Sequence, residues 1–303
     1  MDQFDQLFDQ LQKCCPDMEL LKQEPMARHT TFRIGGPVPI MARPTNEEQV
    51  LACVRLAREN QIPLVVLGNG SNLLVADEGV QAFVLDMTGL SRLERTGERE
   101  ITVGAGVTLA RLASFAAGEG LTGLEFAGGI PGTLGGAVMM NAGAYGGEMV
   151  QVVRRTRCLT PEGTVKEIIG EEHDFSYRHS VFSQGKDVIL SSVLELEPGQ
   201  EENIRAQMAE LAQKRRSKQP LEYPSAGSMF KRPQGYFAAA LIDQCGLKGF
   251  TVGGAQVSEK HAGFVINRGG ATCADVLALV REVQRRVREQ TGVELEMEVR
   301  RLG

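Results

Sequence analysis

The chain has 303 residues, 42% of them hydrophobic and 23% charged, which is typical of a globular protein and excludes wholesale disorder. Its 38 acidic and 33 basic residues leave a net charge of −5, which argues against a dedicated nucleic-acid-binding protein. The first residues lack the pattern of a signal peptide, and no run approaches about 18 apolar residues. The sequence therefore predicts a cytoplasmic protein without membrane insertion.

The cysteines and the four histidines are scattered, without the CxxC, HxxxH or HExxH spacing that metal sites use. We therefore expect no metal site, no disulfide framework, and thiols that are buried or without function. The six cysteines are Cys14, Cys15, Cys53, Cys158, Cys245 and Cys273.

The first section of the chain alternates helical and extended patterns and ends near residue 88. Its predicted elements are a helix at 2–15, a helix that opens near 45, and strands at 63–67 and 82–85. Thr45 is the expected N-cap of the second helix, with Glu48 as its capping-box partner. The apolar run at 63–67 is typical of a buried strand.

The remaining chain divides at a charged helix that begins near residue 201. The elements predicted before it are strands at 100–103, 152–159 and 188–196 and a helix at 108–117; those predicted after it are a helix at 274–290 and a closing strand at 293–302. We expect an α+β protein with domains at 1–88, 89–200 and 201–303. In an alternative division of the chain, the last few residues before 303 belong to the first domain.

A first glycine-rich loop directly follows the predicted strand at 63–67. Glycines bring backbone N–H donors close to a phosphate, and the serine and asparagines add side-chain donors. The residues are Gly68, Asn69, Gly70, Ser71 and Asn72. An ordinary hairpin turn is the alternative.

A second glycine-rich loop runs towards a helix predicted to start at Ala137. Such a backbone suits a planar ring and a diphosphate, and a glycine-rich packing corner is the alternative. The residues are Gly128, Gly129, Ile130, Pro131, Gly132, Gly135, Gly136 and Ala137. Because the two loops belong to separate sections, they predict one cofactor held between those sections.

A third glycine pair, Gly104 and Gly106, resembles the start of a Rossmann fingerprint. Leu109 occupies the position of its third glycine, and no strand ends in an acidic residue at the required distance. We therefore reject a Rossmann site here.

Three polar groups lie outside the loops. Arg178 lies among aromatic residues and offers a guanidinium fork for a carboxylate, with a surface salt bridge as the alternative. Ser228 follows a glycine in a segment between two prolines; it lacks a GxSxG elbow, and a turn-forming serine is the alternative. Alternation places Glu298 and Arg300 on one face of the closing strand, and a solvated charged face is the alternative.

Together these segments resemble the family of UDP-N-acetylenolpyruvoylglucosamine reductases. The resemblance extends over residues 29–303 in the segments HTTFRIGG, LGNGSNLL, GLEFAGGIPGTLGGAVMMNAGAYGG, FSYRHSVF, SAGSMFKRP, KHAGFVIN and EVRRLG. It implies a two-subdomain FAD-binding module of the vanillyl-alcohol-oxidase type, followed by a C-terminal α+β substrate domain. It also implies non-covalent FAD, because neither glycine loop contains His or Cys.

The resemblance implies that NADPH reduces FAD, and that a hydride and a proton then convert the enolpyruvyl ether to UDP-N-acetylmuramate. Ser228 matches the general acid, and Arg178 and Glu298 match groups that stabilise the enolic intermediate. Lys218, Lys231 and Arg300 match cations that contact the substrate. The sequence shows no separate NADPH motif and no obligate protein partner.

Only a short turn separates Arg178 from the next strand, so the chain resembles the shorter type of this enzyme, without a tyrosine lid loop. Two alternatives stay open from the sequence. One is another flavin oxidoreductase of the same fold, and the other is a nucleotide-sugar-binding protein without redox function.

Overall fold

The computed structural model describes residues 2–303, which form two compact units. The chain crosses between the units several times, so neither unit is continuous in sequence. The first unit contains the residues up to Lys22 with Pro39–Asn69 and Ala82–Lys214, and the second contains Gln23–Val38, Gly70–Gln81 and Arg215–Gly303. The domain boundaries expected at residues 88 and 200 stay a prediction, because the two units are discontinuous in sequence and do not correspond to three consecutive domains.

A four-stranded sheet forms one part of the first unit, with the order β1-β2-β5-β3. β2, β5 and β3 run parallel, and the helices α1 and α2 bury their apolar faces in the same core. The elements are α1 (Gln3–Cys14), β1 (Glu19–Pro25), β2 (Pro37–Arg43), α2 (Glu47–Glu59), β3 (Leu64–Leu67) and β5 (Phe83–Asp86).

Two predictions in this part were wrong in detail. Asn46, not Thr45, caps α2: its side chain accepts from Gln49 N at 2.9 Å, and Gln49 Oε1 accepts from Thr45 N at 2.8 Å. The capping partners are therefore shifted by one residue. The strand β3 lies at the sheet edge, and Val66 is 45% exposed, because an edge strand is covered on one side only.

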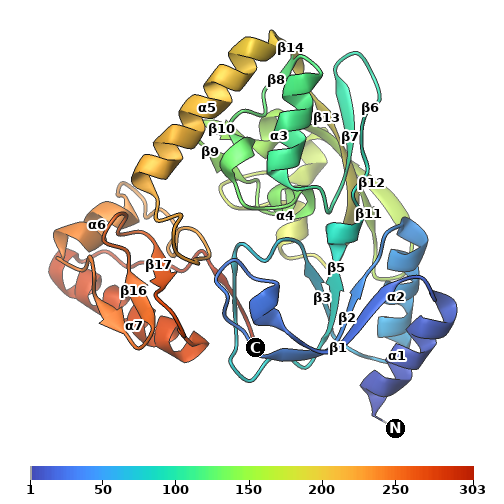
Figure 1. The fold of residues 1–303 in the computed structure, drawn as a ribbon, viewed down its shortest axis with the longest axis horizontal. Helices are drawn as coiled ribbons and strands as arrows, with labels where there is room; N and C mark the ends of the chain where they lie inside the picture. Colours follow the sequence, from blue (N-terminus) through green and yellow to red (C-terminus); the bar gives the residue numbers. More distant parts are fainter. Residues whose placement is uncertain (1) are drawn as a thin grey trace. The chain divides into compact units, whose positions relative to one another are not determined.

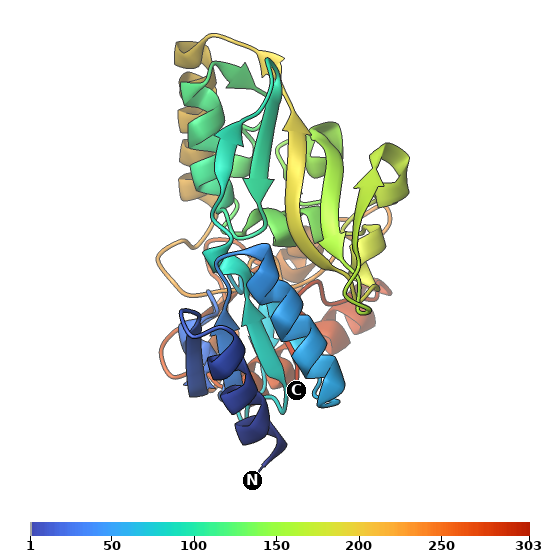
Figure 2. The same cartoon turned by 90° about the vertical axis from the view of Figure 1, so that its right-hand side faces the viewer.

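An antiparallel five-stranded sheet forms the other part of the first unit, with the order β12-β11-β13-β7-β6 (Figure 2). The strands are β6 (Leu93–Arg95), β7 (Glu100–Gly104), β11 (Val153–Leu159), β12 (Val165–Ile169) and β13 (Val188–Glu195). The helices α3 (Leu109–Gly118) and α4 (Leu134–Met139) add buried apolar residues to the core of this unit. Two short pairs complete it: β8 (Leu121–Thr122) with β14 (Glu197–Pro198), and β9 (Gly143–Ala144) with β10 (Gly147–Glu148).

The second unit has its own apolar core, built on the helices α6 and α7 and a sheet of order β15-β16-β17, drawn in orange and red in Figure 1. Its elements are β4 (Leu73–Val75), α6 (Ala238–Gln244), β15 (Thr251–Val252), β16 (Ala255–Val257), β17 (Val265–Asn267), α7 (Cys273–Thr291) and β18 (Arg300–Leu302). The helix α5 (Glu201–Lys218) begins in the first unit and ends in the second. The mixed parallel and antiparallel architecture confirms the α+β class.

The closing strand is shorter than predicted. Only Arg300–Leu302 forms a regular strand, which pairs in parallel with β4. The residues before it make an isolated bridge between Met297 and Phe230 instead of a continuous ladder. The predicted alternation still holds, because Leu295 and Val299 are buried.

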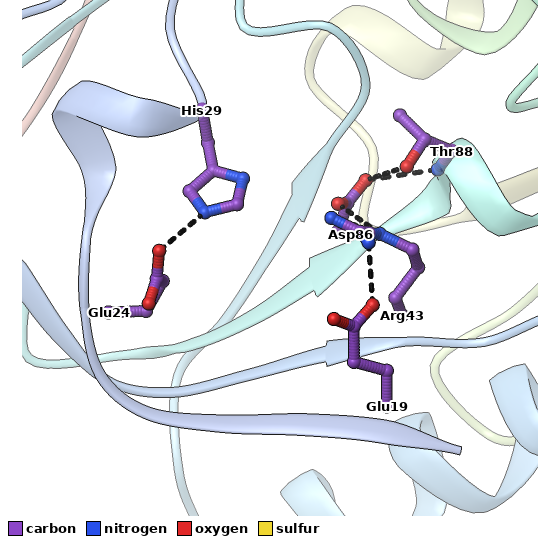
Figure 3. A network of polar contacts seen from close by, with 6 residues as sticks. All are labelled: Glu19, Glu24, His29, Arg43, Asp86 and Thr88. Carbon is purple, nitrogen blue, oxygen red and sulfur yellow. Dashed lines mark hydrogen bonds and ion pairs between the residues drawn. The ribbon is translucent and has the colours of Figure 1, made fainter. Parts of the chain in front are cut away.

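A buried carboxylate links three neighbouring strands of the first sheet (Figure 3). Asp86 is 2% exposed; its Oδ2 accepts from Arg43 Nε at 2.9 Å, and its Oδ1 accepts from Thr88 Oγ1 at 2.7 Å. Arg43 also donates to Glu19 Oε2 at 2.5 Å, so the network joins β1, β2 and β5. The nearby carboxylates raise the pKa of Arg43, against the effect of its partial burial.

We expect Asp86→Ala to lower the free energy of unfolding of the first unit by about 2 kcal/mol, because a half-buried guanidinium and a backbone N–H then lose their acceptor. Urea unfolding followed by circular dichroism measures the change. The control is Glu94→Ala, which removes the partner of Arg92 in an exposed ion pair and should leave the midpoint unchanged. Equal midpoints for the two variants would contradict the role of Asp86.

Candidate functional site

The structure brings the two predicted glycine loops together within the first unit. Asn69 Nδ2 donates to the carbonyl oxygen of Pro131 at 2.6 Å. A Cβ atom built on Gly68 would lie 2.3 Å from Thr133 Oγ1, far inside contact distance. The loops can therefore approach this closely only because residue 68 has no side chain.

The first loop continues into the second unit at Gly70. Gly70 has a φ of +58°, and a Cβ there would lie 2.0 Å from the carbonyl oxygen of His29. Both the backbone conformation and the lack of space require glycine. Ser71 and Asn72 follow as half-buried residues.

The second loop enters α4 earlier than predicted, at Leu134 instead of Ala137. The N–H groups of Leu134 and Gly135 donate to Val107 O at 2.8 Å and Ala105 O at 2.9 Å. These two donors hold the loop against the end of β7, so they do not serve as phosphate donors. Exposed backbone that a cofactor could contact lies at Gly129 and Gly136.

The rejected pair Gly104 and Gly106 has a packing role. Cβ atoms there would lie 2.4 Å from Leu90 O and 2.1 Å from Met87 O. The two glycines therefore let β7 and the turn after it pass close to the neighbouring backbone.

Arg178 lies in a tight turn of the first unit. Ser176 and His179 close this turn with two backbone hydrogen bonds of 3.2 Å, and Arg178 has a φ of +56°. A non-glycine residue in this left-handed region is strained, and such strain is concentrated at functional sites. The Arg178 guanidinium lies 5.0 Å from the ring centroid of Tyr177, so an aromatic face supports the charged group.

The turn is tied to the chain that follows the second glycine loop. Asn141 Nδ2 donates to Ser176 O at 3.2 Å, and Ser180 Oγ donates to Met139 O at 2.8 Å. Asn141 is 1% exposed and has a φ of +41°. Sequence reasoning missed Asn141; the signal was a single polar residue within a run of small residues.

Ser228 and Glu298 come together in the second unit. The neighbour of Ser228, Met229, donates to Gly263 O at 2.8 Å and accepts from Glu298 N at 2.9 Å. Ser228 itself forms an isolated bridge with Phe264 and is exposed. Three segments therefore lie side by side, with Ser228 on the middle one and Glu298 on an outer one.

The first glycine loop is bonded to the Glu298 segment within the same unit. Asn72 Nδ2 donates to Glu298 O at 3.3 Å, and Arg300 N donates to Asn72 O at 3.0 Å. Asn72 was expected to offer its side chain to a cofactor, and here that side chain contacts the protein. These hydrogen bonds place the segment that carries Ser71 next to the segment that carries Arg300.

The other predicted cations differ in their surroundings. Lys231 forms an ion pair with Glu296, and Lys231 N donates to Glu296 O at 2.9 Å, which holds the two segments in register. Lys218 is exposed at the last residue of α5.

The six cysteines are all unpaired, and burial raises the pKa of Cys15 and of Cys158 to about 11. Within residues 2–303 no group of three or more His, Cys, Asp or Glu side chains could hold a metal ion. No helix in that range is both long and apolar enough to cross a membrane.

Comparison with known proteins identifies the families that this chain matches. Residues 38–169 match the model of the FAD binding domain family, and residues 219–302 match that of the UDP-N-acetylenolpyruvoylglucosamine reductase C-terminal domain. The chain is 49% identical over 300 residues to the UDP-N-acetylenolpyruvoylglucosamine reductase of Agathobacter rectalis, which covers 95% of each chain. It is 45% identical over 303 residues to the enzyme of the same name from Geobacillus thermodenitrificans, and this alignment covers 100% of this chain and 99% of the relative.

Solved structures agree. The crystal structure of UDP-N-acetylenolpyruvylglucosamine reductase from Thermus caldophilus superposes with a TM-score of 0.80 at 36% identity, covering 94% of this chain and 99% of that one. Alkyldihydroxyacetonephosphate synthase shares the fold over 65% of this chain, with a TM-score of 0.50 at 19% identity. These matches confirm the predicted fold of the vanillyl-alcohol-oxidase type.

The chain is therefore an FAD-dependent oxidoreductase. More narrowly, it belongs to the UDP-N-acetylenolpyruvoylglucosamine reductase family, as the resemblance of its motifs predicted.

We expect Gly68→Ala to reduce the flavin content of the purified protein strongly, because the new methyl group collides with Thr133 Oγ1 and separates the loops. Adding Thr133→Ala removes that oxygen and leaves Thr133 Cβ at 3.5 Å, an ordinary contact, so the double variant should regain flavin. The ratio of flavin to protein absorbance measures both effects.

Two controls accompany this test. Thr133→Ala alone reports any direct contribution of the hydroxyl group to flavin binding. Gly118→Ala has free space, its nearest neighbour being Arg205 Nη2 at 3.8 Å, and should retain normal flavin. A double variant as poor in flavin as Gly68→Ala would show that the collision is not the cause.

Proposed function

We propose that Ser228, Arg178 and Glu298 carry out the chemistry by which this chain reduces the enolpyruvyl ether of UDP-N-acetylglucosamine enolpyruvate to UDP-N-acetylmuramate. NADPH is the hydride donor, and the product is a precursor of peptidoglycan. The observation that carries the assignment of residues is the pairing of the Ser228 and Glu298 segments through Met229.

The glycine loops would hold FAD, because their exposed backbone at Gly129 and Gly136 leaves room for close approach. A bound FAD would supply the hydride-transfer chemistry between NADPH and C3 of the enolpyruvyl group. A chain with a larger residue at position 68 could not hold the loops this way.

Ser228 donates a proton to C2 of the enolpyruvyl group. A serine hydroxyl is a weak acid, so transfer requires that C2 become strongly basic while the donor is already aligned. The backbone hydrogen bonds of Met229 support this role, because they fix the backbone next to Ser228 on the segment beside Glu298.

Arg178 and Glu298 stabilise the enolic intermediate. The strained turn and the Tyr177 ring present the Arg178 guanidinium as a planar fork suited to the substrate carboxylate. Glu298 lies on the segment next to Ser228. Lys218, Lys231 and Arg300 contribute positive charge towards the sugar nucleotide.

The chain corresponds to the shorter type of this enzyme. Residues 179–187 form only the 3₁₀ helix η6 (Val181–Ser183) before β13 begins, which is too short a segment for a lid loop.

We further propose that the protein acts in the cytoplasm without an obligate protein partner. Cell fractionation and size-exclusion chromatography of the active form test these two points.

The function is tested by two anaerobic additions. NADPH should bleach the flavin absorbance, and UDP-N-acetylglucosamine enolpyruvate should restore it. A protein that is bleached by NADPH but not reoxidised by this substrate acts on another molecule. A purified protein that contains no flavin and does not bind added FAD would contradict the assignment as a flavoenzyme.

We expect Ser228→Ala to leave NADPH-driven bleaching nearly intact and to slow reoxidation by the enolpyruvyl substrate by about 10²–10⁴-fold, the usual contribution of a general acid. Stopped-flow absorbance measures both half-reactions. Ser91→Ala, an exposed serine of the first unit, is the control. An equal loss in both half-reactions would identify Ser228 as a structural residue.

We expect Arg178→Lys to reduce turnover roughly a hundredfold, because lysine keeps the charge but loses the planar fork. Steady-state oxidation of NADPH measures the effect. Arg154→Lys alters an exposed arginine that donates to Glu195 at 2.6 Å and should retain full turnover. Turnover of Arg178→Lys at the level of this control would contradict the assignment.

A further inference from the structure

A fully buried histidine lies at the base of the loop that carries Arg178. His173 is 0% exposed, and its ring stacks on Phe175 at 4.8 Å with an interplanar angle of 8°. Phe182 meets the same ring edge-on at 6.4 Å. Because Phe175 and Phe182 flank the Arg178 turn in sequence, the ring of His173 holds the two ends of the loop together.

Hydrogen bonds connect this ring to the five-stranded sheet. His173 Nδ1 lies 2.9 Å from Gly170 O, and Nε2 lies 2.9 Å from Thr156 Oγ1. Thr156 Oγ1 in turn lies 2.9 Å from Ser192 Oγ, on the facing residue of β13. A carbonyl oxygen only accepts, so Nδ1 carries the proton, and Nε2 of the neutral ring accepts from Thr156.

The backbone beyond His173 is strained at two places. Asp174 has a φ of 48° and Arg178 a φ of 56°, both in the left-handed region that non-glycine residues seldom adopt. Strained residues persist only where their surroundings hold them. The sheet holds this loop at its base through Thr156 and His173, while Asn141 holds the turn itself.

We propose that His173 is a positioning residue that keeps the Arg178 turn in its strained conformation and so fixes the guanidinium for the substrate carboxylate. The proposal rests on the proposed role of Arg178. Because His173 is fully buried, it would act on the substrate through the loop alone.

The neutral state of the ring is part of this arrangement. Burial lowers the pKa of His173, while the Gly170 carbonyl and the charge of Glu172 oppose that effect. Thr156 of β11 and Phe182 of η6 contact the ring and are uncharged, as is Ser192 of β13, which bonds to Thr156 behind it. A protonated ring would place a hydrogen on Nε2 and turn the Thr156 hydroxyl away from it.

The lowered pKa of His173 determines how the stability of the folded chain changes with pH. The unfolded chain binds the proton of this histidine more readily than the folded chain does. The stabilisation is therefore complete above about pH 6.5, the ordinary pKa of histidine, and is lost as the pH falls below it.

The main test is His173→Phe, which keeps an aromatic ring but removes both hydrogen bonds. We expect reoxidation of the flavin by the enolpyruvyl substrate to slow by about ten- to a hundredfold, because the guanidinium is displaced, while bleaching by NADPH stays within about twofold of wild type. His173→Asn retains a donor for Gly170 O but loses the ring that contacts Phe175 and Phe182, so it should recover only part of the rate. A His173→Phe variant with wild-type reoxidation would overturn the proposal.

A double variant separates positioning from general damage. If His173 acts through Arg178, His173→Phe should cause little further loss in an Arg178→Lys protein. If His173→Phe reduced the reoxidation rate by the same factor in the Arg178→Lys protein as in wild type, the proposal would be overturned. As a readout besides activity, the midpoint of thermal unfolding of wild type should fall between about pH 6.5 and 5 more steeply than that of His173→Phe; equal slopes would count against a neutral buried ring.

Matched threonine variants cover the case in which His173→Phe does not fold. Thr156→Val removes the donor to Nε2 and should reproduce part of the reoxidation defect. Thr102→Val removes an exposed hydroxyl pair with Thr96 in the same sheet and should react like wild type. Equal rates in the two threonine variants would overturn the proposal, and a wild type that the substrate does not reoxidise would instead refute the proposed function.

Discussion

The approach of Gly68 to Thr133 is the constraint on which the flavin-binding part of the structure depends. A hydrogen atom at residue 68 leaves room for the Thr133 hydroxyl, and the bond from Asn69 to Pro131 O then joins the loops. The end of β7 holds the second loop by accepting from Leu134 and Gly135. The two loops thus form one backbone surface, although about sixty residues of sequence separate them.

Each unit carries its own part of the proposed chemistry. In the second unit, Asn72 bonds to the Glu298 segment, and Met229 places Ser228 beside it. In the first unit, Asn141 ties the Arg178 turn to the chain after the second glycine loop. A backbone atom takes part in each of these bonds, so the positions of the candidate residues depend on how the segments pair.

Two errors of prediction, the start of α4 and the length of the closing strand, share one cause, which is tertiary contact acting on short segments. Local propensity placed the start of α4 at Ala137, but the carbonyls after β7 accept from Leu134 and Gly135 and begin the helix earlier. The closing strand was predicted too long because its alternation, which is real, reflects burial against the second core and not a continuous ladder. Long amphipathic helices such as α7 were predicted almost to the residue, since their period depends on many positions.

The sequence by itself determined the glycine loops, the α+β class and the candidates Arg178, Ser228 and Glu298, because glycine content, periodicity and unusual polar motifs are local properties. Only the tertiary structure decided that the first loop is shared between two units and that Asn72 bonds to protein. It alone revealed Asn141 and His173 beside the Arg178 turn. Hydrogen bonds between distant segments and the burial of a neutral ring depend on which parts of the chain meet, and no local pattern records that.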